Sequence, residues 1–561
     1  MTVFGYFAFV NEAHFSLLVE KGTASKELTL IMIAHVLRFV EKPSEEVLAR
    51  ADAYADLAIA ETLPRTYQGF GAVELMVLLL AQHYNIHRGK FTSAWLLVGN
   101  CTRMMQMMSL HAFDRTYKSE LPSELSPLLS REALRRIAWA TFYADSMVDG
   151  GRRGFHVVDE TTLGSLQLPC DEPDFVAHHE VVTESLFVSD LEPASIKPAQ
   201  LGMSAYLLRT AAARRRALHF AFRASHQEDT IDRLTAELRQ IESHIEGVFN
   251  SLPDHLHFNA SNWLLHQQRL TTFILLHVLR HNLFIITGRA ALQIYNREPV
   301  NTWLLDKARR KKIAHAFPIA ELIAKGLEDG VIFDPHIGVQ AYVALEILIF
   351  EPGRLAATDT HMDPRAHEIE IAIGHLLTLI RDLAARSDTI YRLHIEAVYR
   401  LLQHNWIRLL NDNDLNSFRR EYRLVGQDAA EYDFRKFSWA KLERASRDAN
   451  APASMPRDEV LLECQAKEAT AAELPPRRDA RDITTSASQP QILQPSYSSS
   501  LDTLYNQGTS IGNELALGYE FQPLLEQVTS QNLAQEFSLD WSTWLFDGSG
   551  TSWPTSSSAT F

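Results

Sequence analysis

The fold class of this 561-residue chain is decided by residues 262–288, which read NWLLHQQRLTTFILLHVLRHNLFIITG. Drawn as a helix, the segment is apolar on nearly every face, and Gly288 is expected to end it. A helix that is apolar all round belongs in the middle of a large bundle. Because His277, Arg280 and His281 interrupt a run that is also too short for a bilayer, we expect no membrane contact.

Segments on both sides of this run have the same helical spacing. Ala94, Leu97, Cys101 and Met105 fall on one face of a helix that we expect to begin after Ser93 as N-cap, with the methionines and the thiol in the core. The first ten residues are expected to start a core helix, and another helix follows Ser130. Further helices are expected over residues 28–39, 47–61, 73–84, 230–250, 313–327, 341–349, 369–386 and 389–410. The sequence therefore predicts an all-α fold, a large helical bundle or array.

The net charge and the cysteine count exclude several classes of function. The net charge of −15 argues against non-specific attraction of the whole chain to nucleic acid or anionic membrane. Three cysteines, Cys101, Cys170 and Cys464, exclude a disulfide framework and a four-cysteine zinc site, and they indicate a reducing compartment. We therefore expect no cofactor.

The chain changes character after Arg481, its last basic residue. Residues 482–561 carry eight acidic side chains and many aromatic ones, with no Lys, Arg or His. This composition is typical of disordered activation segments. The predicted organisation is a helical regulatory domain at 1–440, a polar linker at 441–491 and a disordered acidic-aromatic segment at 492–561.

One stretch of this tail has helical periodicity. Leu533, Phe537, Trp541, Trp544 and Leu545 would form one apolar stripe that fits a hydrophobic groove. The alternative is that this aromatic C-terminus packs back on the helical domain. The predicted partner-binding residues are Leu533, Phe537, Leu539, Trp541, Trp544, Leu545 and Phe546.

Four segments occur in a recognisable order and spacing. They are residues 78–95 (LLLAQHYNIHRGKFTSAW), 99–111 (GNCTRMMQMMSLH), 135–145 (RRIAWATFYAD) and 166–175 (LQLPCDEPDF). Together they resemble the regulatory middle-homology domain of fungal zinc-cluster (Zn2Cys6) transcription factors, and residues 73–175 match best. The chain departs from the family at residues 150–154 (GGRRG), where the family usually has Gly-Arg-Pro.

The resemblance implies a nuclear regulator of transcription by RNA polymerase II, of which a metabolic or biosynthetic gene set is one candidate target. The family binds DNA through six closely spaced cysteines that hold two zinc ions. The three cysteines here are 69 and 294 positions apart. We therefore expect DNA contact only indirectly or through a missing N-terminal module, in a protein that either lacks the module or is a partial product of a longer gene.

The expected partners are coactivator or mediator-type proteins bound by the tail, and related factors in a homo- or heterodimer. One alternative is a scaffold or corepressor that titrates a full-length factor without touching DNA.

An all-α isoprenoid-type enzyme is the last alternative. Asn413, Ser417 and Glu421 have the spacing of the magnesium motif of class I terpene synthases, on one helix face. No aspartate-rich motif lies upstream, so we interpret residues 411–414 as a helix N-cap region. Phosphate loops and the Gly-x-Ser-x-Gly motif are also missing, and the sequence predicts no enzyme.

Two further patterns remain open. The pairs His83/His87 and His277/His281 have i, i+4 spacing without an evident third metal ligand, so we expect surface or hydrogen-bonded core residues. Two basic runs are candidates for nuclear import, with a solvated helix face as the alternative. They comprise Arg214, Arg215, Arg216, Arg309, Arg310, Lys311 and Lys312.

Overall fold

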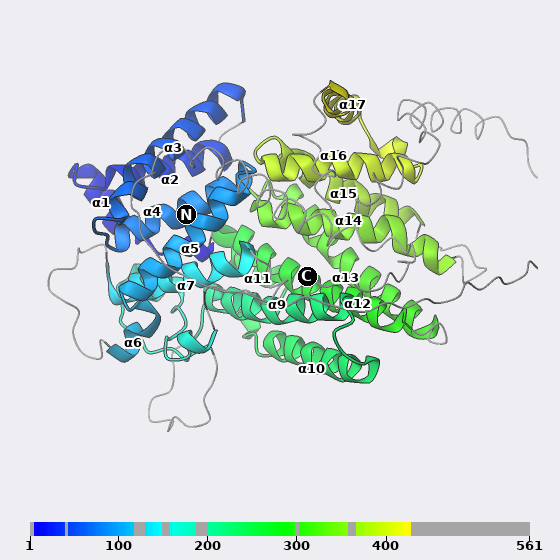
Figure 1. Ribbon diagram of the computed structural model, residues 1–561, viewed down its shortest axis with the longest axis horizontal. Helices are drawn as coiled ribbons and strands as arrows, with labels where there is room; N and C mark the ends of the chain where they lie inside the picture. The colour runs from blue at the N-terminus through cyan, green and yellow to red at the C-terminus, as the bar shows by residue number, and fades with distance from the viewer. Residues whose placement is uncertain are drawn as a thin grey trace, which may run out of the picture. The chain divides into compact units, whose positions relative to one another are not determined.

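The computed structural model describes residues 5–39, 43–116, 129–148, 158, 160–186, 200–297, 302–356 and 366–427. These residues are helical and belong to one compact unit, and within them the only β pairing is two isolated bridges (Figure 1). The prediction of an all-α fold is confirmed. The predicted linker, the acidic-aromatic segment and the proposed boundary at residue 440 lie outside the described residues.

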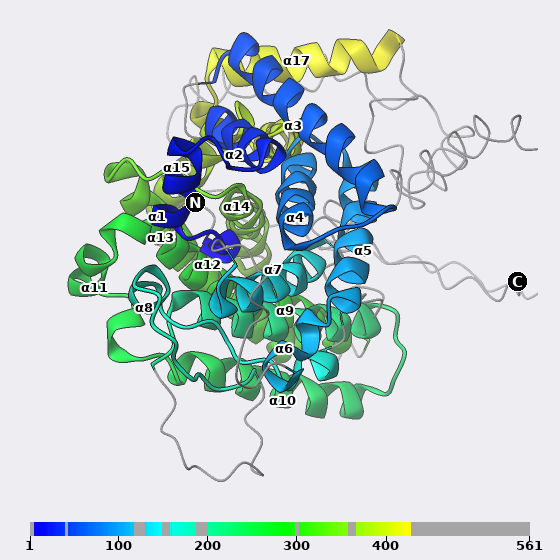
Figure 2. The same cartoon turned by 90° about the vertical axis from the view of Figure 1, so that its left-hand side faces the viewer.

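The helices follow one another with short connections. The first group is α1 (Glu12–Glu20), α2 (Lys26–Phe39), α3 (Glu45–Thr66), α4 (Ala72–His87), α5 (Phe91–Met107), α6 (Phe113–Thr116), α7 (Arg131–Val148) and α8 (Glu172–Val176). The second group is α9 (Met203–Ser225), α10 (Ile231–Asn250), α11 (Ala260–Leu265), α12 (Leu270–Tyr295), α13 (Thr302–Glu328), α14 (Pro335–Ala356), α15 (Ala366–Ala384), α16 (Asp388–Gln403) and α17 (Asp412–Gln427). Figure 2 shows α4 and α5 next to α7, and both of these helices pack on α7.

Helix α12 is the central helix that the sequence predicts. It packs against α9, α10, α13 and α14 (Figure 1). Residues Gln267–Tyr295 are long and apolar enough to cross a membrane, but 89% of the apolar window is buried inside the protein. Its apolar faces are therefore covered by other helices, as a core helix requires.

The predicted ends of this helix are wrong. Residues 260–265 form the separate helix α11, and α12 continues through Gly288 to Tyr295. A Cβ at position 288 would lie 2.8 Å from Cγ of Lys312 on α13. Gly288 is therefore a close-packing glycine and not a stop signal.

Two other local predictions are wrong. Helix α5 begins at Phe91, before the expected cap, and the Ser93 hydroxyl accepts a hydrogen bond from Nδ2 of Asn85 at 3.0 Å. The apolar N-terminus forms only the short 3-10 turn η1 (Gly5–Phe7), which buries Tyr6. The helix after Ser130 is confirmed, with its hydroxyl accepting from the amide of Ala133 at 3.2 Å.

Segments from the two ends of the described chain are tied together. Arg38 on α2 donates to the carbonyl of Arg386 at 2.8 Å, and Arg386 donates back to the carbonyl of Phe39 at 3.0 Å. Thr389 on α16 donates to the carbonyl of Ile86 on α4. The first helices are thus held by elements roughly 300 to 350 residues later.

Candidate functional site

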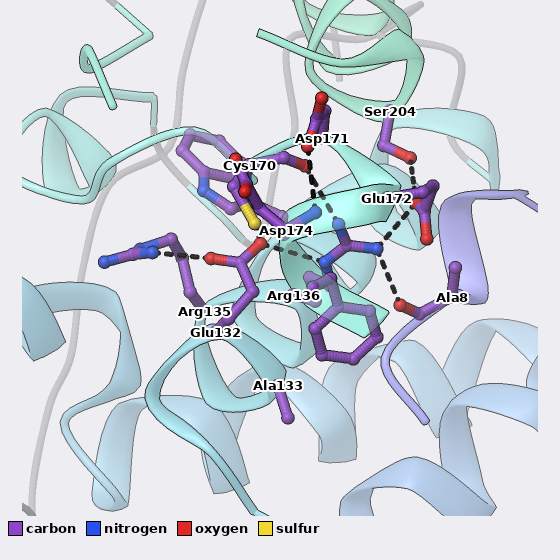
Figure 3. A network of polar contacts seen from close by, with 12 residues as sticks. Ala8, Glu132, Ala133, Arg135, Arg136, Cys170, Asp171, Glu172, Asp174 and Ser204 are labelled. Carbon is purple, nitrogen blue, oxygen red and sulfur yellow. Dashed lines mark hydrogen bonds and ion pairs between the residues drawn. The ribbon is translucent and has the colours of Figure 1, made fainter. Parts of the chain in front are cut away.

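Arg136 lies at the centre of a buried polar network on α7 (Figure 3). Its guanidinium donates to Glu132, one turn earlier, at 2.9 Å and to Glu172 on α8 at 2.7 Å. It also donates to the carbonyl oxygens of Ala8 at 3.0 Å and Cys170 at 2.9 Å. One side chain thus fastens α7 to the N-terminal segment and to the start of α8.

Arg135 extends this network to a further segment. Its guanidinium grips both carboxylate oxygens of Asp114, at 3.0 and 2.7 Å, and also donates to Glu132. Asp114 and Glu132 in turn accept from the backbone amides of Gln167 at 2.9 Å and Cys170 at 3.0 Å. The residue 166–175 segment is therefore positioned by carboxylates that the two arginines hold.

Charge in this network is balanced, because three cations face three carboxylates. The set, which we call the arginine network, comprises Asp114, Glu132, Arg135, Arg136, Glu172 and Arg269. Burial alone would lower the pKa of Arg135 and Arg136, but the neighbouring carboxylates raise the pKa of both above its usual value. Burial likewise opposes ionisation of Glu172, and Arg136 and Arg269 together lower its pKa.

The rest of the motif on α7 makes similar contacts. Trp139 donates from Nε1 to the carbonyl of Gln167 at 2.7 Å. Asp145, at the end of the motif, accepts from the amide of Val158 at 3.0 Å and forms an ion pair with Arg215 on α9. The segments 135–145 and 166–175 that the sequence singles out thus lie together, and their polar groups engage one another.

Residues that sequence reasoning missed complete this site. Asp114, three residues after the 99–111 segment, and the carbonyl of Ala8 are single groups outside the motifs, and nothing in their local pattern marks them. The arrangement offers ion pairs and backbone contacts, so its chemistry is that of a clamp between chain segments. Among the described residues of this network we find no arrangement of nucleophile, base and acceptor that would support catalysis.

The predicted partner-binding residues Leu533, Phe537, Leu539, Trp541, Trp544, Leu545 and Phe546 lie outside the described residues. Both alternatives for the tail therefore remain predictions.

The two basic runs are only partly solvated. Arg215 is buried in its pair with Asp145, and burial lowers the pKa of Arg214 to about 10. Lys312 is buried against Glu351 at 2.5 Å. A solvated helix face is therefore wrong for these three, and none of them is accessible to an import receptor while folded. The more exposed members are Arg216, Arg309, Arg310 and Lys311.

The magnesium motif at Asn413 is a helix N-terminus. The amide of Asn411 donates to Asp414 at 2.9 Å, and the amide of Asp414 donates to Asn411 at 2.9 Å. This reciprocal pair confirms the N-cap interpretation. Burial would raise the pKa of Asp414, but hydrogen bonds from His394 and Arg381 lower it to about 2. The Glu421 carboxylate accepts from the hydroxyl of Tyr391 at 3.0 Å.

Three of the four paired histidines are core residues, and His281 is half-buried. His277 is buried with Nε2 3.0 Å from the carbonyl of Leu256, and Nδ1 of His281 lies 3.0 Å from Nδ1 of His315. The pair His83/His87 is buried and hydrogen-bonded, as one of the two predicted alternatives has it. Asp334 and His336, at the start of α14, place ligand-type atoms beside His83, and the three lie within 4.8 Å of one another. The short DPH sequence at 334–336, inside an apolar stretch, was the available signal.

Comparison with known proteins identifies this region. A model of the fungal specific transcription factor domain matches residues 6–201. Residues 6–201 are a fungal specific transcription factor domain. The matched range contains the arginine network except Arg269, and it is wider than the 73–175 core expected from the motifs.

The relatives are transcription factors. An uncharacterized transcriptional regulatory protein of Schizosaccharomyces pombe is 27% identical over 32% of this chain and 26% of its own length. A Zn(2)-C6 fungal-type transcription factor of Fusarium oxysporum f. sp. lycopersici is 24% identical over 59% of this chain and 37% of its own length. A citrinin biosynthesis transcriptional activator of Monascus ruber is 24% identical over 22% of this chain and 24% of its own length.

The matches span about a quarter to a third of these curated relatives. No solved structure matches the chain. The fungal specific transcription factor domain defines a family of transcription factors and not of enzymes, so the isoprenoid-type alternative is set aside.

Proposed function

We propose that this chain regulates transcription in the nucleus, with the helical domain controlling the exposure of an activating tail. The observation that carries the proposal is the fungal specific transcription factor domain at 6–201, whose motif side chains are locked into one buried network. The family is consistent with a nuclear protein. In this proposal, DNA is reached through a partner or through a module outside these 561 residues.

The tail supports the activating role. Residues 482–561 have eight carboxylates and no cation, so charge repulsion opposes collapse and leaves the aromatic side chains available to a partner. The stripe from Leu533 to Leu545 would then bind a hydrophobic groove on a coactivator as a helix. The target genes would form a metabolic or biosynthetic set, as the printed name of the Monascus ruber activator suggests by analogy.

A reporter assay tests the proposal. Residues 482–561 fused to a heterologous DNA-binding domain should activate transcription, and replacing Trp541, Trp544 and Phe546 by Ala should abolish it. The matched control replaces three tail aromatics outside the stripe, Tyr497, Tyr505 and Tyr519, and should keep most of the activity. A silent fusion would overturn the activating role.

The same assay separates regulator from scaffold. A fusion that carries the full chain should activate less than the tail alone, because the helical domain restrains the tail. If the full chain lowers the activity of a related DNA-bound factor and its own tail is silent, the corepressor alternative is correct instead. Co-purification from nuclei identifies that factor.

A further inference from the structure

A second buried polar group lies beneath α4, and we call it the histidine cluster: Tyr6, His83, His87, Asp334 and His336. All five side chains are buried, with exposed fractions of 0 to 7%. They come from the η1 turn, from α4 and from the beginning of α14. Segments about 77 and 250 residues apart in sequence therefore converge on one point.

In the part of the chain that the structure describes, no lysine or arginine pairs with Asp334. Its carboxylate, 0% exposed, accepts from the Tyr6 hydroxyl at 2.9 Å and from the amide of His336 at 2.8 Å. Nδ1 of His336 lies 3.2 Å from the same carboxylate. Among the described residues no Lys or Arg forms an ion pair with Asp334, and an ionised carboxylate buried without a counter-charge costs several kcal/mol.

Two histidines on α4 belong to the cluster. Burial and the neighbouring imidazoles lower the pKa of His83 well below its usual value, and burial, the neighbouring imidazoles and Arg38 do the same for His87. Nε2 of His87 lies 3.2 Å from Nε2 of His83. Nδ1 of His87 lies 3.2 Å from the hydroxyl oxygen of Ser387. In the tautomer that carries the proton on Nδ1, Nε2 of His87 is a hydrogen-bond acceptor.

The spacing of the polar atoms fits a small metal ion. Tyr6 Oη lies 2.9 Å from His83 Nε2, 2.9 Å from the Asp334 carboxylate and 3.3 Å from His336 Nδ1. Four ligands at Zn²⁺ bond lengths of 2.0–2.1 Å are separated from one another by about 3.3 Å in a tetrahedron. The ligand atoms of His83, Asp334 and His336 all lie within 4.8 Å, so small side-chain shifts would bring them to that geometry.

We propose that the histidine cluster binds one divalent ion of the Zn²⁺ class through His83, Asp334 and His336, with the Tyr6 hydroxyl oxygen as fourth ligand. Binding of the ion displaces one proton from the cluster. The Tyr6 O–H bond breaks, its proton passes to solvent, and the two positive charges of the ion are balanced by the tyrosinate and the Asp334 carboxylate. Two imidazole nitrogens and two oxygens form a ligand set that suits Zn²⁺.

This site is distinct from the zinc cluster of the family, which is made of cysteines, and it does not rest on the proposed function. Its consequence is mechanical. Because the ligands come from both ends of the described chain, an ion would fasten the N-terminal turn to α14 and stabilise the closed helical body by mass action.

Metal titration of the full, untagged chain tests the proposal. After chelator treatment and dialysis, ZnCl₂ is added and binding is followed by isothermal titration calorimetry and by thermal denaturation. We expect one ion per chain, a higher Tm with Zn²⁺, and proton release that is seen as heat differences between buffers. The Co²⁺ form should show the visible absorption of a tetrahedral N/O site.

Variants locate the ion. His336→Gln and Tyr6→Phe should each keep the helical far-UV spectrum. His336→Gln should weaken Zn²⁺ binding by more than about 100-fold, since even indirect partners of a metal site cost 10- to 100-fold. Tyr6→Phe should bind more weakly without proton release. His281→Gln, in a half-buried histidine pair elsewhere, is the control and should bind as the unmodified chain does.

Two results would overturn the proposal. One is a chain that takes up no stoichiometric Zn²⁺ and shows no change of Tm. The other is binding that His336→Gln and Tyr6→Phe leave unchanged, which would place the ion elsewhere. Either result leaves the cluster as a hydrogen-bonded network without an ion.

Discussion

The arginine network and the histidine cluster are both largely buried polar groups, yet they balance charge in different ways. In the arginine network each carboxylate faces a guanidinium, as Glu172 faces Arg136 and Arg269. In the histidine cluster a single carboxylate, Asp334, faces a hydroxyl, an amide and an imidazole. The first arrangement pairs each of its carboxylates with a guanidinium, whereas no Lys or Arg among the described residues pairs with the carboxylate of the second.

Removing the central arginine should have the largest effect. Arg136→Ala leaves Glu132 and Glu172 buried without their main counter-charge, which typically costs about 3–5 kcal/mol. We expect the free energy of unfolding to fall by that amount in urea denaturation followed by circular dichroism. Arg136→Lys keeps the charge but not the planar guanidinium. Its free energy of unfolding should lie between those of the unmodified chain and of Arg136→Ala. A loss below 1 kcal/mol for Arg136→Ala would contradict the clamp.

Lowering the pH should reduce stability through a histidine that lies beside the histidine cluster. Burial lowers the pKa of His35, whose ring lies 5.3 Å from that of His83, to about 4 from 6.5. On acidification the imidazole of His35 takes up a proton at a higher pH in the unfolded chain than in the folded chain. The contribution of neutral His35 to the free energy of unfolding is therefore fully present above pH 6.5 and is lost as the pH falls toward 4. At pH 5 the loss from His35 is about 2 kcal/mol.

Comparing the unmodified chain with His35→Gln between pH 7.5 and 5 measures this contribution. The variant should lose about 2 kcal/mol less over that range. Parallel pH profiles would show that the pKa of His35 is the same in the folded and the unfolded chain, and would contradict a lowered pKa in the folded protein.

A neutral contact at the edge of the arginine network should matter less. Trp139→Phe keeps the ring packing but removes the hydrogen bond to the carbonyl of Gln167, and the expected cost is about 1 kcal/mol. Urea denaturation measures it. An unchanged midpoint would mean that water replaces the indole N–H at this carbonyl.

The smallest effect is expected at an exposed ion pair. Arg216 is 42% exposed and pairs with Glu160 at 2.9 Å, so Arg216→Gln should change stability by less than about 0.5 kcal/mol. Its neighbour Arg215, 2% exposed against Asp145, provides the contrast, and Arg215→Gln should cost several times more. Equal effects at the two positions would remove the distinction between buried and exposed charges.

Local periodicity predicted most of the fold, because apolar spacing directly reports which face of a helix is buried. It located α2, α3, α4, α7, α10 and α12. It missed α9, where Arg214 and Arg215 interrupt the apolar pattern although both are buried. The carboxylate that pairs with Arg215 is Asp145 on α7, 70 residues earlier, and no local pattern shows that.

The two sites were predictable to different degrees. The segments at 135–145 and 166–175 were recognised from the sequence, and the structure brings them together. The histidine cluster was half recognised, as the pair His83/His87. Its other half, Asp334 and His336, is about 250 residues away and depends on tertiary packing alone.

The hydrogen bonds that join Arg386 to Arg38 and Phe39 have a consequence for the synthesis of the chain. Arg38 and Arg386 are 348 positions apart, and a ribosome that adds about 5–20 residues per second needs roughly 17–70 s to pass from one to the other. During that interval the surfaces of α2 and α4 that the later helices cover stay exposed to the cytosol. The family match at 6–201 is therefore shorter than the part of the chain that folds together. A nascent chain released at residue 201 would expose apolar surface and would be bound by chaperones or degraded by proteases.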